Sequence, residues 1–184
     1  MKYIEVERKF ACPNPAELVD RLSGLGASPG KQTRQVDAYY NAPHRDFLAP
    51  GTISEWLRLR DEDGSASINY KHWLPADASV KTHCDEYESA VSDIEALRRT
   101  LKALDFEPLV VVDKVRQEWR FDDVTVAVDE VAGLGSFVEF EFSGDAETVE
   151  AALDRLSKFT ADLGVPLGDP MRLGYPHLLL GRER

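Results

Sequence analysis

The chain has 184 residues, of which 43% are hydrophobic and 30% charged, a balance typical of a soluble globular protein. No Ser/Gly-rich or Pro-rich stretch divides it, so a single domain over residues 1–184 is expected. The formal net charge of -11 argues against nucleic acid or acidic membranes as general partners.

The N-terminal segment and the lack of long apolar runs predict a cytoplasmic protein, and the two cysteines are expected to be ordinary thiols. The N-terminus opens into an alternating charged segment with no apolar signal region, and no apolar run approaches membrane-spanning length. Cys12 and Cys84 lie far apart and outside any CxxC spacing, which indicates neither a zinc site nor a disulfide framework.

Alternation of polar and apolar residues with a period of two predicts about eight strands. In chain order they lie near residues 3–11, 34–41, 53–61, 66–74, 84–91, 110–121, 124–131 and 136–142. Turns at 61–64 and at Asp122-Asp123 join neighbouring strands as tight hairpins, so antiparallel pairing is expected. The element order is too irregular for a doubly wound parallel sheet, which leaves the α+β class.

Helix signals separate these strands. Asn14 caps a predicted helix over 15–25, Ser92 with Glu95 forms a capping box that opens a helix over 93–104, and Gly164 closes a helix over 146–163. A short helix is also expected around 170–180. The four histidines show no metal-binding spacing, and the glycine pairs lack a dinucleotide-loop context, so neither is assigned a role.

Charged side chains concentrate on one face of the predicted strands. Residues two apart share a face, so Glu139 and Glu141 project together, away from Val138 and Phe140. A solvent-exposed face would be enough to explain the charged residues of any one strand. Acidic pairs and basic pairs nevertheless segregate onto different strands, which favours the lining of a closed or nearly closed barrel with an acidic and a basic pole.

Such a lining suits a metal ion and phosphate. Two carboxylates about 4 Å apart repel by roughly 4 kcal/mol at an effective dielectric of about 20, so a crowded group of them needs a cation. Ligands that are all oxygen favour Mg²⁺ or Mn²⁺. Arginine forks and lysine ammonium groups bind phosphate oxygens.

The order of motifs along the chain resembles the CYTH superfamily, which joins class IV adenylyl cyclases, thiamine triphosphatases and inorganic triphosphatases. The motifs are the ExExK string Glu5-Val6-Glu7-Arg8-Lys9, then 37–40, Leu57-Arg58-Leu59-Arg60, Tyr70-Lys71, 86–88, Lys114-Val115-Arg116, 129–131, 133–141 and 174–179. The stretch from Asp37 to Phe47 is most similar to the cyclase branch. The tail departs from the family, which often has Ser where this chain has Gly174.

The resemblance implies an eight-stranded antiparallel β-barrel, the triphosphate tunnel, with helices packed outside. Carried over by position, the metal-binding carboxylates would be Glu5, Glu7, Asp129, Glu139 and Glu141. The phosphate-binding cations would be Lys9, Arg58, Arg60, Lys71, Lys114 and Arg116, and Tyr39 with Lys71 would form a catalytic pair.

Three functions remain open at this point. The favoured one is a class IV cyclase that converts ATP to cyclic AMP and pyrophosphate. The alternatives are a triphosphatase acting on inorganic triphosphate, thiamine triphosphate or a nucleoside triphosphate, and a sensor that binds nucleotide or polyphosphate without catalysis. A homodimer is left open.

Overall fold

The computed structural model describes residues 4–181, and within this range the chain forms ten strands and four helices. The strands are β1 (Ile4–Glu5), β2 (Glu7–Ala11), β3 (Ser28–Asn41), β4 (Glu55–Glu62), β5 (Ser65–Leu74), β6 (His83–Ala90), β7 (Glu107–Phe121), β8 (Val124–Val131), β9 (Gly135–Phe142) and β10 (Pro170–Met171). The helices are α1 (Pro15–Gly24), α2 (Ile94–Ala103), α3 (Val149–Leu163) and α4 (Tyr175–Leu179). The chain divides into two compact units, residues 1–33 with 114–172 and residues 34–113 with 173–184.

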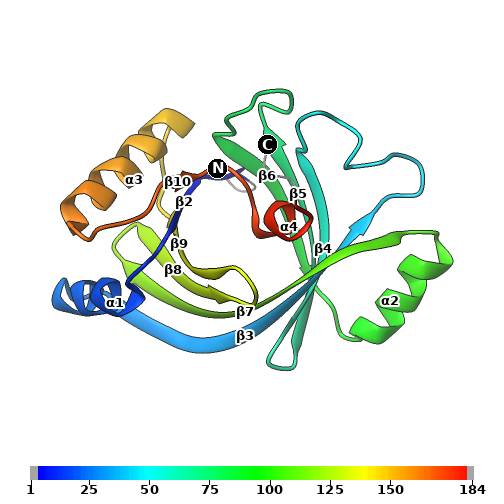
Figure 1. Ribbon diagram of the computed structural model, residues 1–184, viewed down its shortest axis with the longest axis horizontal. Helices are drawn as coiled ribbons and strands as arrows, with labels where there is room; N and C mark the ends of the chain where they lie inside the picture. The colour runs from blue at the N-terminus through cyan, green and yellow to red at the C-terminus, as the bar shows by residue number, and fades with distance from the viewer. Residues whose placement is uncertain (1–3, 182–184) are drawn as a thin grey trace. The chain divides into compact units, whose positions relative to one another are not determined.

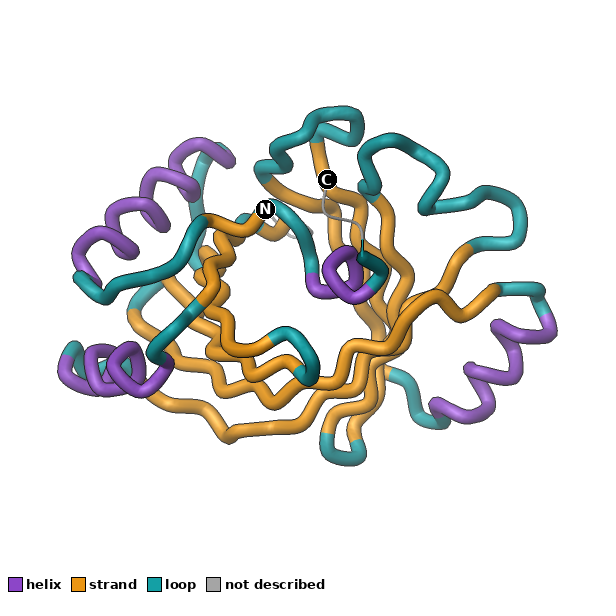
Figure 2. The backbone as a smooth tube through the Cα atoms, viewed as in Figure 1, coloured by secondary structure: helices purple, strands orange, loops and turns teal. Residues whose placement is uncertain are grey.

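The first unit is an antiparallel sheet covered by two helices. Its strands run in the order β7, β8, β9, β2, β10, and every neighbouring pair is antiparallel. Helices α1 and α3 lie on one side of these strands (Figures 1 and 2). Leu18 and Leu22 from α1 and Leu156 and Phe159 from α3 form one core with Phe140 of β9.

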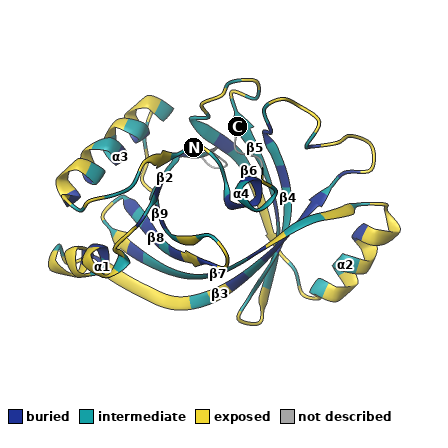
Figure 3. Ribbon diagram, in the orientation of Figure 1, coloured by how far each residue is buried: buried dark blue, intermediate teal, exposed yellow. Residues whose placement is uncertain are grey.

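Strict alternation in this sheet decides which side chains enter that core. Val138 and Phe140 of β9 are fully buried in the core that the helices complete. Glu139 stands between these two residues and Glu141 follows Phe140, so both glutamates project from the opposite face. Figure 3 shows α1 and α3 exposed along the side turned away from the strands.

The second unit repeats this design, with α2 packed against its strands. Its strands run in the order β3, β4, β5, β6, again with antiparallel neighbours. Leu101 of α2 packs in a core with Leu59 of β4 and with Ala38 and Tyr40 of β3. The α+β class with antiparallel strands is therefore confirmed.

All eight expected strands are present, but β3 begins at Ser28 rather than near residue 34, and two further segments differ from expectation. The strand expected over 3–11 is interrupted at Val6, so β1 and β2 are separate; its first residue lies outside the described residues. The helix expected around 170–180 is shorter and is preceded by β10, because Pro170 and Met171 pair with Phe10 and Lys9 at the edge of β2.

The helix ends follow the capping residues, with one correction. Asn14 accepts a hydrogen bond from the backbone of Glu17, and Gly164 adopts the left-handed conformation (φ 67°) that ends α3. The N-cap of α2 is Asp93 rather than Ser92, and its carboxylate accepts from the backbone N–H of Ala96 at 2.9 Å. Aspartate caps as well as serine and stands directly before Ile94.

Tight turns join the hairpins where they were expected. Asp63 and Gly64 both have positive φ, 46° and 90°, which is the requirement of a two-residue hairpin turn whose twist matches the strands. Asp122 has a φ of 52° between β7 and β8.

None of the helices within residues 4–181 is long and apolar enough to span a membrane.

Candidate functional site

The charged face of the first unit brings predicted acids and cations together by strand register. Lys9 of β2 stands opposite Glu139 of β9, and Arg116 of β7 stands opposite Asp129 of β8. Glu7 and Glu141 are also direct partners across β2 and β9. These residues all lie on the face that α1 and α3 do not cover.

Five side chains on this face form a continuous network, which we call the acidic–basic cluster: Lys9, Lys114, Arg116, Asp129 and Glu139. The ammonium of Lys9 lies 2.7 Å from Glu139 Oε1, and Arg116 contacts the other oxygen, Oε2. Arg116 also donates two hydrogen bonds to Asp129, from Nε to Oδ1 at 2.7 Å and from Nη2 to Oδ2 at 2.6 Å. Lys114 completes the acidic–basic cluster, with its Nζ 3.2 Å from Asp129 Oδ2.

The cluster is buried, which a solvated strand face would not be. The exposed fraction of the side chain is 0% for Asp129, 3% for Lys114 and 9% for Lys9, and it reaches only 12% for Glu139 and 13% for Arg116. Ionised groups are seldom this buried unless they are paired or bind a ligand. Burial therefore favours the interpretation of this face as a lining over that of a solvent-exposed surface.

Mutual attraction keeps these groups ionised. Burial would raise the pKa of Glu139, but Arg116 and Lys9 outweigh it and hold that pKa well below the ordinary carboxyl value. The pKa of Asp129 is likewise lowered, because Arg116 and Lys114 overcome the effect of burial. Burial would lower the pKa of Lys9, yet Glu139 and Glu7 raise it on balance.

The second unit carries the other three predicted cations, two of which contact Asp37. Arg60 donates to both oxygens of this carboxylate, and Arg58 Nη1 lies 3.5 Å from its Oδ2. Lys71 lies farther along the same face, with Nζ 3.5 Å from Glu86 Oε1. Burial would lower the pKa of Arg58, but Asp37 outweighs it and raises that pKa, so Arg58 is charged.

Tyr39 shares this face but is held as a neutral phenol. It is 9% exposed, and its ring contacts Trp56 edge-to-face with centroids 5.5 Å apart. Burial raises the pKa of Tyr39 and Asp37 adds to the increase, while Arg58, Arg60 and Lys71 act in the opposite direction without reversing it. Trp56 itself is 4% exposed and packs between Tyr39 and His177, which is a core position.

The predicted metal ligands suit a hard cation by chemistry, although they are not arranged as a finished metal site. Glu7 and Glu141 are opposite one another, with Glu139 next to Glu141 on the same face, and like charges in such positions repel. All offer oxygen ligands, as Mg²⁺ and Mn²⁺ prefer. Within residues 4–181 no three acidic, histidine or cysteine side chains are grouped closely enough to hold a metal ion, and Glu139 is paired with Lys9 and Arg116.

Sequence reasoning missed the partners of the basic residues. Asp37 was part of a recognised motif but was given no role, although it stands directly opposite Arg60 in the ladder between β3 and β4. Glu86 stands opposite Lys71 in the same way. Alternation along each strand could show from the sequence that these residues share a face. It could not show the strand register that pairs them. Glu5 lies in β1, outside the acidic–basic cluster.

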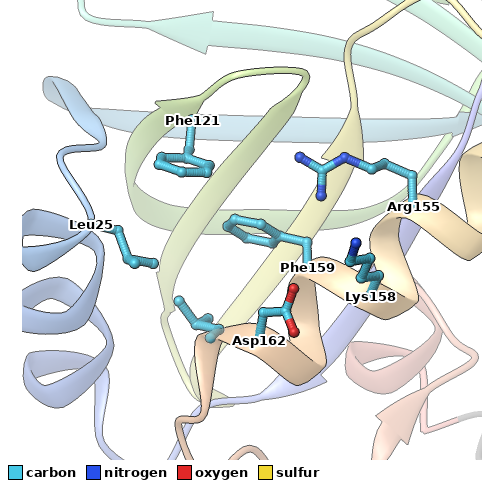
Figure 4. Close-up of a pocket in the computed structure, with 7 residues that line it drawn as sticks. Leu25, Phe121, Arg155, Lys158, Phe159 and Asp162 are labelled. Carbon is cyan, nitrogen blue, oxygen red and sulfur yellow. The ribbon is translucent and has the colours of Figure 1, made fainter.

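A separate pocket lies on the helix side of the first unit. Phe121, Phe159, Arg155, Lys158 and Asp162 are among its lining residues (Figure 4), and its volume is about 380 Å³. Arg155 is already paired with Asp123, with Nη2 2.6 Å from Oδ1. This pocket holds none of the predicted site residues.

Comparison with known proteins agrees with these features. The family model described as the CYTH domain matches residues 3–175. A candidate adenylate cyclase of Methanocaldococcus jannaschii is 31% identical over 176 residues, covering 95% of this chain and 98% of that protein.

Solved structures extend the likeness to three dimensions. A protein of Pyrococcus horikoshii OT3 is 27% identical with a TM-score of 0.80, over 95% of this chain and 98% of that one. A Hippeastrum protein, described as a candidate adenylyl cyclase with a dominant triphosphatase activity, is 18% identical with a TM-score of 0.66, over 97% and 96% of the two chains. At that identity the likeness supports the fold alone.

Proposed function

The chain belongs to the CYTH family, and on this premise we propose that it is a divalent-metal-dependent enzyme acting on a triphosphate-bearing small molecule. The observation that carries the proposal is the acidic–basic cluster, in which three cations and two carboxylates are nearly buried on one sheet face. Cations at this density match the charge of a polyphosphate, and carboxylates beside them match a hard metal ion.

The chain's own residues would bind and orient the substrate. In the first unit Lys9, Lys114 and Arg116 would contact phosphate oxygens, and in the second unit Arg58, Arg60 and Lys71 are the predicted phosphate-binding cations. Glu7, Glu139 and Glu141 would hold Mg²⁺ or Mn²⁺, with Asp129 and Glu5 as the further predicted ligands. When bound, such an ion neutralises charge on phosphate oxygens. Most of the rate in this chemistry comes from alignment and charge stabilisation.

For the reaction itself we propose conversion of ATP to cyclic AMP and pyrophosphate. The 3'-hydroxyl of the ribose attacks the α-phosphorus, the bond from that phosphorus to the bridging oxygen breaks, and the hydroxyl proton is lost. Support comes from the relative named as a candidate adenylate cyclase, which is 31% identical across 95% of this chain. The cyclase-like stretch from Asp37 to Phe47 points the same way.

Hydrolysis of a terminal phosphate is the second candidate, favoured by Tyr39 and Lys71. Both side chains project from one face of the second unit, and the charge of Lys71 acts on the Tyr39 phenol. A neutral phenol beside an ammonium can orient a water molecule. Water then attacks the terminal phosphorus, the bond to the bridging oxygen breaks, the diphosphate part of the substrate departs with that oxygen, and orthophosphate forms with loss of the water proton to solvent.

Phosphorus NMR of reaction mixtures separates these functions. ATP, inorganic triphosphate and thiamine triphosphate are each incubated with Mg²⁺ or Mn²⁺, and we expect pyrophosphate and a cyclic diester from ATP. Orthophosphate as the product would establish the triphosphatase instead, and binding without turnover of any substrate would establish the sensor. Glu141→Gln should lose the activity and Glu130→Gln, an exposed position on the other face of β8, should keep it, which excludes a contaminant.

A further inference from the structure

We propose that Glu139 makes phosphate binding depend on the metal ion, because its carboxylate occupies Lys9 and Arg116 until a cation binds it. The inference rests on the proposed function and adds a regulatory property to the same site. It concerns the order in which charges are exchanged and can be tested without turnover.

The contacts of Glu139 show the competition directly. One oxygen, Oε1, lies 2.7 Å from the ammonium of Lys9, and the other, Oε2, accepts from Arg116. Both oxygens of one carboxylate therefore contact cations that the proposed function assigns to phosphate. A phosphate oxygen and the Glu139 carboxylate are alike in charge and hydrogen bonding, so they compete for the same donors.

Burial makes an unassisted exchange unfavourable. An anion that takes Lys9 and Arg116 leaves the carboxylate of Glu139, which is only 12% exposed, without its counter-charges. An unpaired charge in such a place is strongly disfavoured. A divalent cation removes this obstacle, because it binds the carboxylate and releases the contacts that Glu139 makes with Lys9 and Arg116, while Arg116 stays bonded to Asp129.

Strand register places Glu139 between the carboxylates proposed to bind the metal ion and the cations proposed to bind phosphate. Across β2 and β9 it faces Lys9, while two residues farther along the same face Glu141 stands opposite Glu7. Glu139 is therefore next to a repelling carboxylate pair on one side and to the cations on the other. Asp129 differs, because its side chain is 0% exposed and it is held by Arg116 and Lys114.

The exchange predicts coupling in both directions. A cation that frees Lys9 and Arg116 strengthens the binding of the anion, and by linkage the anion strengthens the binding of the cation to the same extent. It also predicts that removing the charge of Glu139 has opposite effects on the two ligands. Metal binding weakens, whereas metal-free anion binding tightens.

Calorimetric titration with tripolyphosphate in EDTA, at constant ionic strength, tests this. Relative to the wild type, we expect Glu139→Gln to bind metal-free tripolyphosphate about tenfold more tightly, since even a part of the released attraction amounts to a factor of that size. Glu130→Gln, which removes the same charge from an exposed position, should bind like the wild type. A Mn²⁺ titration of Glu139→Gln should show weaker metal binding.

Equal metal-free affinity in the wild type and Glu139→Gln would overturn the inference and leave the proposed function standing. If neither protein binds tripolyphosphate with or without metal, the proposed function fails as well. A circular dichroism melt verifies folding. Should Glu139→Gln not fold, Glu139→Asp serves instead, because a side chain one methylene shorter withdraws the carboxylate from Lys9 and Arg116. Its metal-free affinity should rise in the same direction, and an unchanged affinity would again overturn the inference.

Discussion

Asp37 and Arg60 form a two-point ion pair in which Arg60 Nε lies 2.7 Å from Oδ1 and Nη2 lies 2.8 Å from Oδ2. Asp113 and Arg34 form a pair of nearly the same geometry, with distances of 2.9 and 2.6 Å. The pairs differ in burial, since Asp37 is 2% exposed and Asp113 is 38% exposed. They thus separate the effect of burial from that of geometry.

Asp37→Asn should lower the free energy of unfolding by about 3–5 kcal/mol, because it leaves the buried guanidinium of Arg60 without its counter-charge and weakens the hold on Arg58. Asp113→Asn should have little effect, since water compensates an exposed pair. Urea denaturation of both variants measures the difference. Similar losses in the two variants would mean that burial of the Asp37 pair contributes nothing.

The stability of the protein should fall on acidification, partly through Glu139. A carboxyl whose pKa is lower in the folded chain stabilises fully above its ordinary value of 4.5, and this contribution is lost as the pH falls through the folded pKa. The gap in urea midpoint between the wild type and Glu139→Gln should therefore narrow from about pH 6 to about pH 3. A gap that stays constant with pH would contradict the lowered pKa.

Arg58→Ala should weaken the binding of tripolyphosphate by roughly 2 kcal/mol, about thirtyfold, with the fold retained. Arg60 continues to hold Asp37 in this variant, so the carboxylate keeps a partner. Arg34→Ala, on an exposed side chain, is the matched control and should bind as the wild type does. Wild-type affinity in Arg58→Ala would remove this arginine from the phosphate site.

Tyr39 should not act as a phenolate at neutral pH. Burial raises the pKa of Tyr39 above its ordinary value of 10.0, so the phenol keeps its proton throughout the working range. Turnover should therefore show no pH-dependent change below about pH 9 that is due to Tyr39, so the profiles of the wild type and Tyr39→Phe should have the same shape in that range. Tyr40→Phe, on the opposite face of β3, controls for the lost hydroxyl. A limb near neutral pH that only Tyr39→Phe removes would show a lowered pKa instead.

Much of the fold followed from local pattern. The strand over 124–131 has the bounds that alternation predicts, and the ends of α1 and α3 follow Asn14 and Gly164. These features depend on neighbours in the chain, since period and capping act within a few residues. The same periodicity also placed Glu139 and Val138 on opposite faces before any partner strand was known.

The partners of the charged residues depended on the tertiary structure. Arg116 contacts Asp129 and Glu139, which are 13 and 23 residues away in sequence, and Arg60 reaches Asp37 on a different strand. Strand register decides such pairs, and a slip of one residue would move every side chain to the other face. β10 was likewise not foreseen, because two residues carry too little periodicity to mark a strand.

The sequence by itself determined which residues share a face, because alternation of side chains is a local property of an extended backbone. Only the tertiary structure decided that the charged face is buried and that Glu139 is shared by Lys9 and Arg116. Burial and ion pairing depend on strands distant in sequence, and their register arises from packing of the opposite, apolar face against α1 and α3.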